Sequence, residues 1–415
     1  MPETLTLKLT DMANGGDALG RDEDGRVIFV PYTIPGEKVR VEITEDKERF
    51  AHGRLLELLE AAPERAEPRC PHFGVCGACQ WQHISYEAQL RYKREIVRDQ
   101  LARIGGMEAV TVRETLPNPE PWAYSIDVSF SRTPEGELGF WSPFLEQVMP
   151  IEICHLIRPQ LLELFQDTDL TFPELRRLTL RVGDDQALLM ALEVEGLEPP
   201  ELATDFPISV AVVLPDGTAA NLVGDNFLVQ QVEGPYGETR DFRVSAGSFF
   251  YPSPPATGKL VETVLQYASL QGGETVLDGY CGVGTLSAFL AGRAASVLGI
   301  EAAPDAVEDA AVNLDDLDNV TLYQGALEEV LPEFTTRPDV MVVDPPPEGL
   351  SRDVVAMLGG AGLDRVIYVS SDVATLARDG RQLRQEGYRL AEIQPIDMLP
   401  QTYQVLTVSL WRFEE

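Results

Sequence analysis

Four cysteines have a spacing that suits metal chemistry. Cys70, Cys76 and Cys79 lie in CPHFGVCGACQWQ with the pattern C-x5-C-x2-C, and Cys154 lies some 75 residues further on. Three close thiolates and a distant fourth favour a four-iron four-sulfur cluster. Zinc bound by four cysteines is the rival interpretation, and unligated buried thiols are the structural one. The fifth cysteine, Cys281, is predicted to be a small packing residue, and disulfides are not expected in a cytoplasmic chain.

Acidic residues end three β-prone segments in the last third of the chain. VLDGYCGVGT places Asp278 before a glycine-rich turn, SVLGIE ends with Glu301, and VMVVDPP places Asp344 after its last valine. Gly282 and Gly284 let the backbone approach a ligand closely, and an acidic side chain about 17 residues further on can accept both hydroxyls of a ribose. No phosphate-binding lysine accompanies them. This favours an adenosyl ligand without phosphate, S-adenosylmethionine, over a dinucleotide or a vacant site.

A fourth β-prone segment, VIYVSSDVATLARD, stops at Ser371 and Asp372 before helix-forming residues begin. In open α/β sheets, reacting groups collect outside the carboxyl ends of the strands, so a side chain here is placed where chemistry occurs. The structural interpretation is that Ser371 or Asp372 caps a helix from Val373 to Glu386, since both side chains accept bonds from free amides at a helix start.

Three stretches of different patterning must position these residues. From residue 234 to 415 strands alternate with helices, which predicts an α/β, Rossmann-like domain with a doubly wound, mostly parallel sheet. Residues 1–62 alternate short β-type runs with the turn signals NGGD, EDGR and IPGE, typical of a small antiparallel β-barrel. Residues 63–233 carry the cysteines, a helix and short strands without a readable period, and are predicted to form an α+β central domain.

The charge balance restricts the partners. Among 415 residues, 67 are acidic and 33 basic, which gives a formal net charge of −34. Such a surface repels phosphate backbones, so nucleic-acid binding requires a local basic patch; a high-salt environment is the alternative origin of the charge. The most basic segment is the predicted helix over 86–104, with Arg91, Lys93, Arg94, Arg98 and Arg103 expected to be exposed. A solvated face is the common explanation of such a charge run.

The N-terminus and the hydropathy pattern exclude some locations. No apolar run approaches the ~18 residues that a membrane span needs. MPETLTLKLTDMANGGD lacks a basic segment followed by an apolar one, so no secretory signal is expected. The sequence therefore predicts a cytoplasmic protein without a membrane partner.

The motifs taken together resemble a known enzyme family. CPHFGVCGACQWQHISYEAQLRYKREIVRDQL, SAGSFF, DGYCGVGTLS, VVDPP, YVSSDVATLARD and IDMLPQTY follow one another along nearly the whole chain. In this order they are similar to the RNA (uracil-5-)-methyltransferase family, in the branch that carries a TRAM domain and an iron–sulfur cluster. The resemblance implies S-adenosylmethionine as methyl donor, a structured RNA as acceptor with ribosomal RNA favoured over transfer RNA, and a monomer. It also implies a site made of donor-binding Tyr251, Tyr280, Thr285, Glu301 and Asp344 and of cluster ligands Cys70, Cys76, Cys79 and Cys154.

Two departures from the family pattern fall on its reacting groups. The family's strand ends YVSCNPATLARD, and its cysteine nucleophile, which adds to uracil C6, falls on Ser371. An alcohol is almost wholly protonated near neutrality, whereas a few per cent of an ordinary cysteine is thiolate, so Ser371 would need a neighbouring base. The family's DMFPQTxHVE motif ends in a glutamate that removes the C5 proton. Here that position is Leu406, which cannot accept a proton, and the preceding histidine position is Gln404.

Three further departures fall on binding positions. Tyr251 stands where the FFQ motif has a donor-contacting glutamine, Pro347 where DPPR has its arginine, and Ser125 where PWxYRN has an RNA-contacting arginine. Together these changes indicate that methylation of uracil is lost or altered and that RNA is bound more weakly. Three hypotheses follow: an RNA methyltransferase that is slow at uracil or redirected to an acceptor atom needing no covalent adduct, a catalytically inactive homologue that binds RNA or protein, and an iron–sulfur redox sensor.

Overall fold

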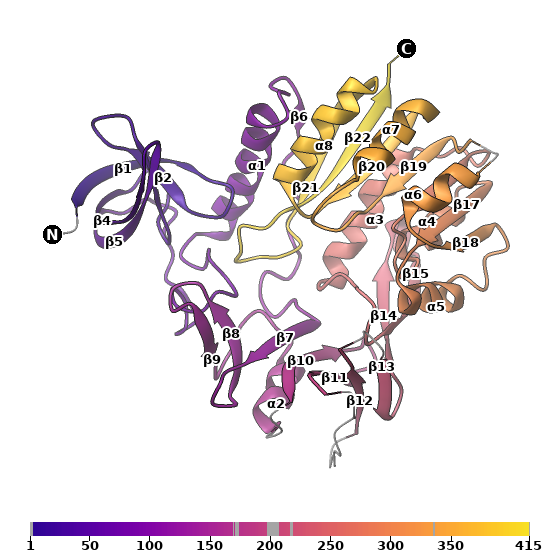
Figure 1. Cartoon of the computed structure of the whole chain (residues 1–415), viewed down its shortest axis with the longest axis horizontal. Helices are drawn as coiled ribbons and strands as arrows, with labels where there is room; N and C mark the ends of the chain where they lie inside the picture. The colour runs from indigo at the N-terminus through magenta and orange to yellow at the C-terminus, as the bar shows by residue number, and fades with distance from the viewer. Residues whose placement is uncertain are drawn as a thin grey trace.

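The computed structural model describes residues 3–168, 170, 174–196, 207–215, 219–334 and 337–414. Three sheet assemblies follow one another along the chain: a closed barrel, a seven-stranded sheet and an eight-stranded sheet, with a two-stranded ribbon between the last two. The barrel stands apart from the eight-stranded sheet, with helix α1 (Tyr86–Arg103) between them (Figure 1). The predicted fold class, a barrel and a central domain before a doubly wound sheet, is confirmed.

The N-terminal barrel has the strand order β1-β2-β3-β5-β4. Alternating residues point inward, as in β1, where Leu7 and Leu9 are buried between exposed neighbours. The expectation of a purely antiparallel barrel is wrong in one pair, because β3 and β5 run parallel. The strands are β1 Thr4–Met12, β2 Ala18–Arg21, β3 Val27–Val30, β4 Lys38–Lys47 and β5 Phe50–Glu60.

The central part is mainly a mixed sheet with the order β13-β12-β11-β10-β7-β8-β9. One helix, α2, packs on it through Leu161 and Leu164. A two-stranded ribbon, β14 with β15, then leads to the eight-stranded sheet. The bounds are β7 Asp127–Arg132, β8 Leu138–Ser142, β9 Gln147–Pro150, α2 Pro159–Asp167, β10 Leu175–Val182, β11 Leu188–Val194, β12 Ile208–Val213, β13 Ala219–Val223, β14 Phe227–Glu233, a 3-10 turn Pro235–Gly237 and β15 Thr239–Ser245.

The eight-stranded sheet has the order β18-β17-β16-β19-β20-β22-β21-β6. Its first five strands are parallel, β22 is antiparallel to both neighbours, and β6 joins the far edge. The elements are β6 Thr111–Val112, α3 Pro254–Ala268, β16 Thr275–Gly279, α4 Thr285–Ala291, β17 Ser296–Glu301, α5 Pro304–Asn313, β18 Val320–Gln324, α6 Leu327–Val330, a 3-10 turn Leu331–Glu333, β19 Val340–Val343, α7 Arg352–Ala361, β20 Arg365–Ser370, α8 Val373–Gln385, β21 Tyr388–Ile396 and β22 Leu406–Phe413.

Helices cover both faces of this sheet. Helices α3, α4 and α5 pack in one core with Val342 and Ile367, whereas α1, α6, α7 and α8 pack in another with Met341 and Val366. Strands buried on both faces need continuous apolar runs, and β19, VMVV, is buried at every position. The alternation of side chains along each strand therefore divides the sheet into the two cores.

Helix α1 and strand β6 belong by packing to the eight-stranded sheet, although they precede the central sheet in sequence. Helix α1 contacts α8, and β6 pairs with β21. The boundaries 1–62, 63–233 and 234–415 stay a prediction. The expectation that Lys93 is exposed on α1 is wrong: its side chain is fully buried, because it forms an ion pair with Asp397 under the helix.

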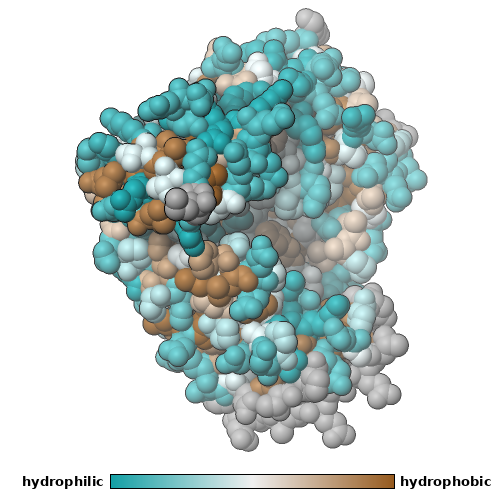
Figure 2. All heavy atoms as spheres, turned by 60° about the vertical axis from the view of Figure 1, so that its left-hand side comes forward, coloured by the Kyte–Doolittle hydropathy of each residue, from teal (hydrophilic) through white to brown (hydrophobic). Residues whose placement is uncertain are grey.

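The face on the barrel side is mostly polar and is hollowed in its middle (Figure 2). Large apolar side chains interrupt the molecular surface at Leu56 and Leu59 of the barrel and at Trp141, Phe144 and Leu145 between β8 and β9. Within the described ranges, no helix is long and apolar enough to cross a membrane.

Candidate active site

Four parallel strands bring predicted site residues to one edge of the large sheet. β16 pairs with β17 on one side and with β19 on the other, and β19 pairs with β20. Because parallel strands end at the same edge, Glu301, Asp344 and Ser371 lie around the end of β16, which carries Asp278. The strand order therefore brings the ends of these four strands to the same edge of the sheet.

The glycine-rich turn after β16 is held open by unusual backbone angles. Tyr280, Gly282 and Gly284 have φ values of 64°, 56° and 85°, and glycine adopts such angles without the strain that a side chain brings. The Glu301 carboxylate fixes the turn by accepting the Gly282 amide at 2.9 Å, and its other oxygen accepts the amides of Ala302 and Ala303 at 2.8 Å each. The turn and the end of β17 are therefore one rigid unit.

Asp278 is buried beneath this turn. Its Oδ2 accepts the Ser287 hydroxyl at 2.6 Å, and its Oδ1 has no partner among the described residues. Burial, with the charge of Glu301 adding to it, raises the pKa of Asp278 to about 7. Thr285 follows the turn as the first residue of α4 and is itself buried.

Tyr251 and Asp344 are joined by a hydrogen bond. The Tyr251 hydroxyl donates to Asp344 Oδ2 from the loop between β15 and α3. Burial raises the pKa of Asp344 to about 7, the bond from Tyr251 opposes this rise, and the charges of Asp278 and Glu301 add to it. Phe249 lies edge-on to Tyr251 with ring centroids 5.3 Å apart and is 68% exposed. Of the residues predicted to bind the donor, Tyr251 and Asp344 thus contact each other directly, and Glu301 is bonded to the glycine-rich turn.

The two positions of the family's reacting groups face each other across β20 and β22. Ser370 pairs with Thr407 in an antiparallel register, so Ser371 stands opposite Leu406. Ser371 is exposed, and its hydroxyl has no hydrogen-bond partner in the described part of the chain; Leu406 is buried in the sheet core. The base that a serine nucleophile would need is not bonded to it.

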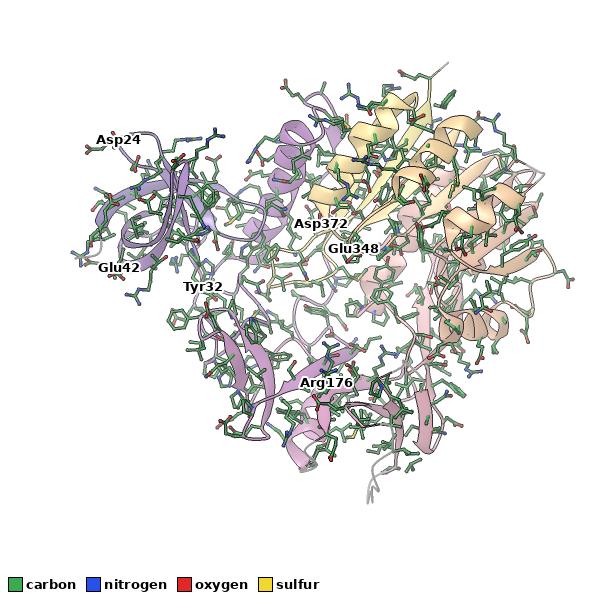
Figure 3. All side chains as sticks on the ribbon, viewed as in Figure 1. Asp24, Tyr32, Glu42, Arg176, Glu348 and Asp372 are labelled. Atoms are coloured by element: carbon green, nitrogen blue, oxygen red, sulfur yellow. The ribbon has the colours of Figure 1, made fainter. Side chains whose placement is uncertain are left out.

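The helix cap predicted at this point is Asp372 rather than Ser371. Asp372 Oδ1 accepts the Thr375 amide at 2.6 Å, and α8 ends at Gln385, one residue before the predicted end. Arg378 of α8 donates to the Glu348 carbonyl at 2.7 Å, so the turn after β19 lies beside the start of α8, where Asp372 and Glu348 are labelled in Figure 3. Ser371 therefore does not cap helix α8.

The remaining substituted positions differ in exposure. Gln404 and Pro347 are exposed, and Ser125 is buried, with its hydroxyl donating to the Asp127 carbonyl at 2.6 Å. A buried serine bound to its own backbone presents no group to a ligand. The position predicted from the resemblance to contact RNA is thus buried in this chain.

The four cysteines gather between the barrel and the central sheet. Cys76, Cys79 and Cys154 are buried in one cluster, and all five cysteines of the chain are free thiols. Burial raises the pKa of Cys76 to about 11 and of Cys79 to about 12, and the charges of Cys70 and Cys154 add to both rises. The thiols therefore lie within electrostatic range of one another. Within the described ranges no group of three or more His, Cys, Asp or Glu is close enough to hold a metal ion.

Sequence patterns did not reveal how the cysteine loop is held. The amides of Gln80 and Trp81 donate to the Gln401 carbonyl at 3.1 and 2.9 Å. Gln89 of α1 accepts the Gln401 amide at 3.0 Å and donates to its side chain at 2.9 Å. The loop just before Leu406 therefore anchors both α1 and the cysteine loop. In the sequence, the hint of this contact is that both segments, CGACQWQ and IDMLPQT, belong to motifs that resemble those of the RNA (uracil-5-)-methyltransferase family.

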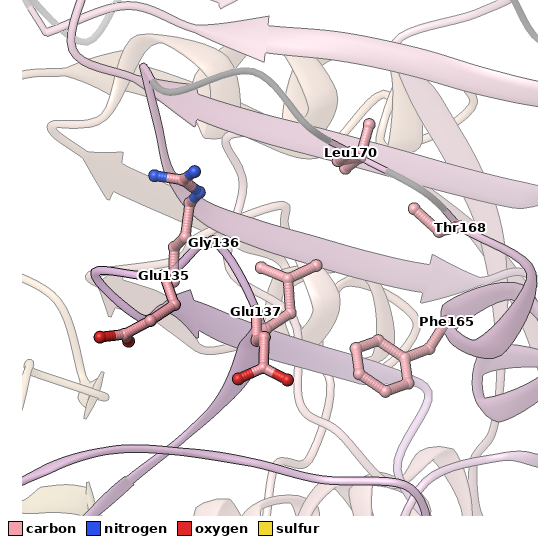
Figure 4. Close-up of a pocket in the computed structure, with 8 residues that line it drawn as sticks. Glu135, Gly136, Glu137, Phe165, Thr168 and Leu170 are labelled. Carbon is pink, nitrogen blue, oxygen red and sulfur yellow. The ribbon is translucent and has the colours of Figure 1, made fainter.

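A pocket in the central part has no link to these residues. It lies between the turn that joins β7 to β8, with Glu135 and Glu137, and the end of α2, with Phe165 and Thr168 (Figure 4). None of the residues predicted for the site lines it.

Comparisons with known proteins decide the family. The TRAM domain profile matches residues 3–56, and the profile described as tRNA (uracil-5-)-methyltransferase matches residues 222–410. An uncharacterised RNA methyltransferase of Halalkalibacterium halodurans is 33% identical and aligns with 98% of this chain and 96% of its own length. This chain belongs to the tRNA (uracil-5-)-methyltransferase family. An uncharacterised RNA methyltransferase of Chlorobaculum tepidum, 31% identical over 100% of this chain and 97% of its own, agrees with the assignment.

A solved member of the family has the same fold. The crystal structure of Pyrococcus abyssi tRNA (uracil-54, C5)-methyltransferase in complex with S-adenosyl-L-homocysteine superposes with a TM-score of 0.75, over 98% of this chain and 100% of that one. At 24% identity the likeness shows the fold. The barrel, central part and large sheet of this chain are thus an arrangement used by this methyltransferase family.

Proposed function

We propose that this protein is an S-adenosylmethionine-dependent RNA methyltransferase that acts as a monomer on structured RNA in the cytoplasm, ribosomal RNA rather than transfer RNA. The single observation that carries this is the acidic site at the strand ends: Asp278, Glu301 and Asp344 around a glycine-rich turn. This arrangement suits an adenosyl ligand without phosphate. Membership of an RNA methyltransferase family supports the acceptor class.

The donor would lie along the glycine-rich turn. Glu301 would accept the ribose hydroxyls in addition to the backbone amides it already accepts, Tyr280 and Thr285 would flank the donor at the turn, and Tyr251 with Asp344 would bound the other end of the site. The sulfonium of the donor carries a positive charge, and three carboxylates around it stabilise that charge. No arginine or lysine forms an ion pair with Glu301 or Asp344 in the described part of the chain, so their charges are available to a cationic ligand.

Donor binding is expected to strengthen about tenfold between pH 6 and pH 8. The pKa of Asp278 and of Asp344 is raised to about 7, so at pH 6 these carboxyls are mainly neutral and at pH 8 ionised; a cation that requires one ionised carboxylate follows that titration. Isothermal titration calorimetry of S-adenosylmethionine at several pH values measures this. S-adenosylhomocysteine, which has no sulfonium, is the control, and an equally steep pH dependence for both ligands would contradict the assignment.

We further propose that the wild-type protein does not form 5-methyluridine through a covalent adduct. Ser371 has no bonded base, and Leu406 offers no proton acceptor opposite it. Enzymes that add a nucleophile to uracil C6 trap RNA containing 5-fluorouridine, because fluorine cannot leave as the C5 proton does. Wild-type protein is expected to give no RNA adduct on a denaturing gel, with the Ser371→Cys variant as the matched comparison. A wild-type adduct would overturn this part of the proposal.

Cys70, Cys76, Cys79 and Cys154 are proposed to hold a four-iron four-sulfur cluster, whose assembly would have to draw together thiols that are not close enough to hold a metal ion in the described part of the structure. Their mutual electrostatic influence and burial support it, and so do donors aimed at sulfur: Gln82 Nε2 lies 3.1 Å from Cys79 Sγ and the Ala78 amide 3.5 Å from Cys76 Sγ. Hydrogen bonds to the sulfurs tune such clusters. Iron and sulfide analysis of anaerobically purified protein tests this against zinc.

A second candidate function is an inactive homologue that binds RNA or protein. The apolar Leu406 at the position of the family's base favours it. It predicts no methyl transfer to any RNA by protein that binds the donor, so it is separated from the first candidate by the transfer assay below.

A further inference from the structure

The turn after β19 begins with a stretch that offers hydrogen-bond acceptors and, at its three prolines, no backbone N–H donors. Asp344 is followed by Pro345, Pro346 and Pro347, and proline has a carbonyl but no N–H. The Pro346 carbonyl accepts the Gly349 amide at 2.8 Å, while Pro346 and Pro347 are exposed. A ligand that meets this turn therefore finds the Asp344 carboxylate and backbone carbonyl oxygens.

One oxygen of the Asp344 carboxylate is held by a hydrogen bond, and the other can accept a bond from a ligand. Tyr251 occupies its Oδ2, and the other carboxylate oxygen has no partner in the part of the chain that the structure describes. The Asp344 amide donates to the Gly279 carbonyl at 3.2 Å, which fixes the start of the turn at the end of β16. The carboxylate is half-buried, so it can accept from a ligand while being shielded from bulk water.

Acceptors on the protein require donors on the ligand. Beside its C5 atom uracil presents the C4 carbonyl oxygen, an acceptor, and an unpaired buried polar group costs about 1–3 kcal/mol. Adenine, cytosine and guanine each carry an exocyclic amino group with two N–H donors. One N–H can reach the free oxygen of Asp344 and the other a proline carbonyl. Such a nitrogen needs neither a covalent nucleophile nor a base at C5, the groups that Ser371 and Leu406 do not supply.

An aromatic surface adjoins the same turn. Phe249 is 68% exposed and lies against Tyr251 with an interplanar angle of 74°. Bases that are splayed out of single-stranded RNA stack on exposed aromatic rings. Phe249 can therefore hold a base by its face while Asp344 meets its edge.

We propose that the methyl acceptor of this site is the exocyclic amino group of an unpaired base in RNA, held by Asp344, with Tyr251 as the residue that positions Asp344. This deepens the proposed function and rests on it, because the methyl group comes from S-adenosylmethionine. The amino nitrogen forms a bond to the methyl carbon while the bond from that carbon to sulfur breaks. The donor leaves as neutral S-adenosylhomocysteine. The nitrogen, now positive, releases one proton to the Asp344 carboxylate, which passes it to water.

The position of Asp344 among other acids suits this proton transfer. Asp278 lies on the adjacent strand β16 and Glu301 ends β17, one strand beyond, and burial with their charges raises the pKa of Asp344 to about 7. A proton acceptor works best when its pKa lies near the operating pH. The bond from Tyr251 lowers this pKa, so the tyrosine sets the pH at which Asp344 becomes ionised.

The first test is the identity of the product. Anaerobically purified wild-type protein is incubated with methyl-labelled S-adenosylmethionine and unmodified ribosomal RNA transcripts, which are digested and separated by chromatography with mass detection. Label is expected in an N-methylated adenosine, cytidine or guanosine. Label only in 5-methyluridine or on ribose overturns this inference and leaves the proposed methyltransferase standing. No label from protein that binds the donor overturns both and favours the inactive homologue.

Variants separate positioning from structure. Asp344→Ala is expected to lower kcat at least 100-fold, and Asp344→Asn to retain more activity, because an amide oxygen still accepts an N–H bond. Tyr251→Phe is expected to move the acid limb of the kcat profile to higher pH, which loss of packing alone would not do. Tyr323→Phe, an exposed tyrosine on β18, is the matched control and should leave the profile unmoved. An unshifted profile in Tyr251→Phe contradicts the role of Tyr251.

Discussion

A Lys93→Met variant is expected to lose about 3–5 kcal/mol of folding free energy, because removing one partner of a buried ion pair leaves the other charge buried and uncompensated. The side chains of Lys93 and Asp397 are both fully buried, and Lys93 Nζ also donates to the Leu399 carbonyl at 3.0 Å. Asp397 Oδ2 already has no partner among the described residues. In the variant, both Asp397 oxygens and the Leu399 carbonyl would face an apolar side chain.

Denaturant unfolding followed by circular dichroism measures this loss. Arg103→Met is the matched control, since Arg103 pairs with Asp99 at 3.2 Å on the exposed side of the same helix and exposed pairs contribute about 0–1 kcal/mol. A Lys93→Met, Asp397→Leu double variant is expected to regain most of the stability, because an apolar pair can replace a buried ion pair. Equal losses from Lys93→Met and Arg103→Met would contradict the burial of the pair.

The Ser371→Cys, Leu406→Glu double variant is expected to form 5-methyluridine at least 100-fold faster than the wild type. The cysteine supplies a thiolate, and general-base catalysis adds about 10²–10⁴-fold. Ser371 and Leu406 stand opposite each other at the ends of β20 and β22, so the two new groups would lie next to each other. Burial raises the pKa of a glutamate at position 406 toward neutrality, where a base is effective.

The product is measured by nucleoside analysis with labelled donor. Ser370→Cys with Leu406→Glu is the control, because Ser370 is buried one residue earlier and successive side chains of a strand point to opposite faces. Activity in both double variants would show that the register argument is wrong. Silence of Ser371→Cys, Leu406→Glu, with donor still bound, would point to the RNA contacts, for which Ser125 stands at a predicted position, or to Tyr251.

Local patterns predicted the elements of this fold better than their contacts. Alternating residues in TLTLKL and the continuous run VMVV define a half-buried strand and a fully buried one, and each pattern depends on one element alone. The parallel pair β3 with β5 depends on how the barrel closes, which no single segment encodes. For the same reason the cap was assigned to Ser371 or Asp372 without distinction, since both residues have side chains that can cap.

The burial of Lys93 shows why contacts between distant segments could not be predicted from the sequence. In a helix with several arginines its charge suggested a solvated face, yet α1 is covered by the barrel on one side and by the large sheet on the other. The partner that makes burial tolerable, Asp397, is 304 residues away in sequence. The acidic residues at the strand ends were predictable because each lies at or next to the end of its own strand. The bonds from Tyr251 to Asp344 and from the cysteine loop to Gln401 join distant segments and required the structure.

The contact between the cysteine loop and Gln401 has a consequence for biosynthesis. Gln89 and its partner Gln401 are separated by 312 residues, and ribosomes add about 5–20 residues per second, so roughly 16–60 s pass between the synthesis of the two. During that interval the cysteine loop can contact the barrel and the central sheet, as in the bonds from Trp81 to the Gly16 carbonyl and from Ser142 to the Val75 carbonyl, but it lacks its anchor at Gln401. The cysteine loop and helix α1 therefore gain this anchor only when the segment that joins β21 to β22 has been made, so their final placement is completed near the end of synthesis.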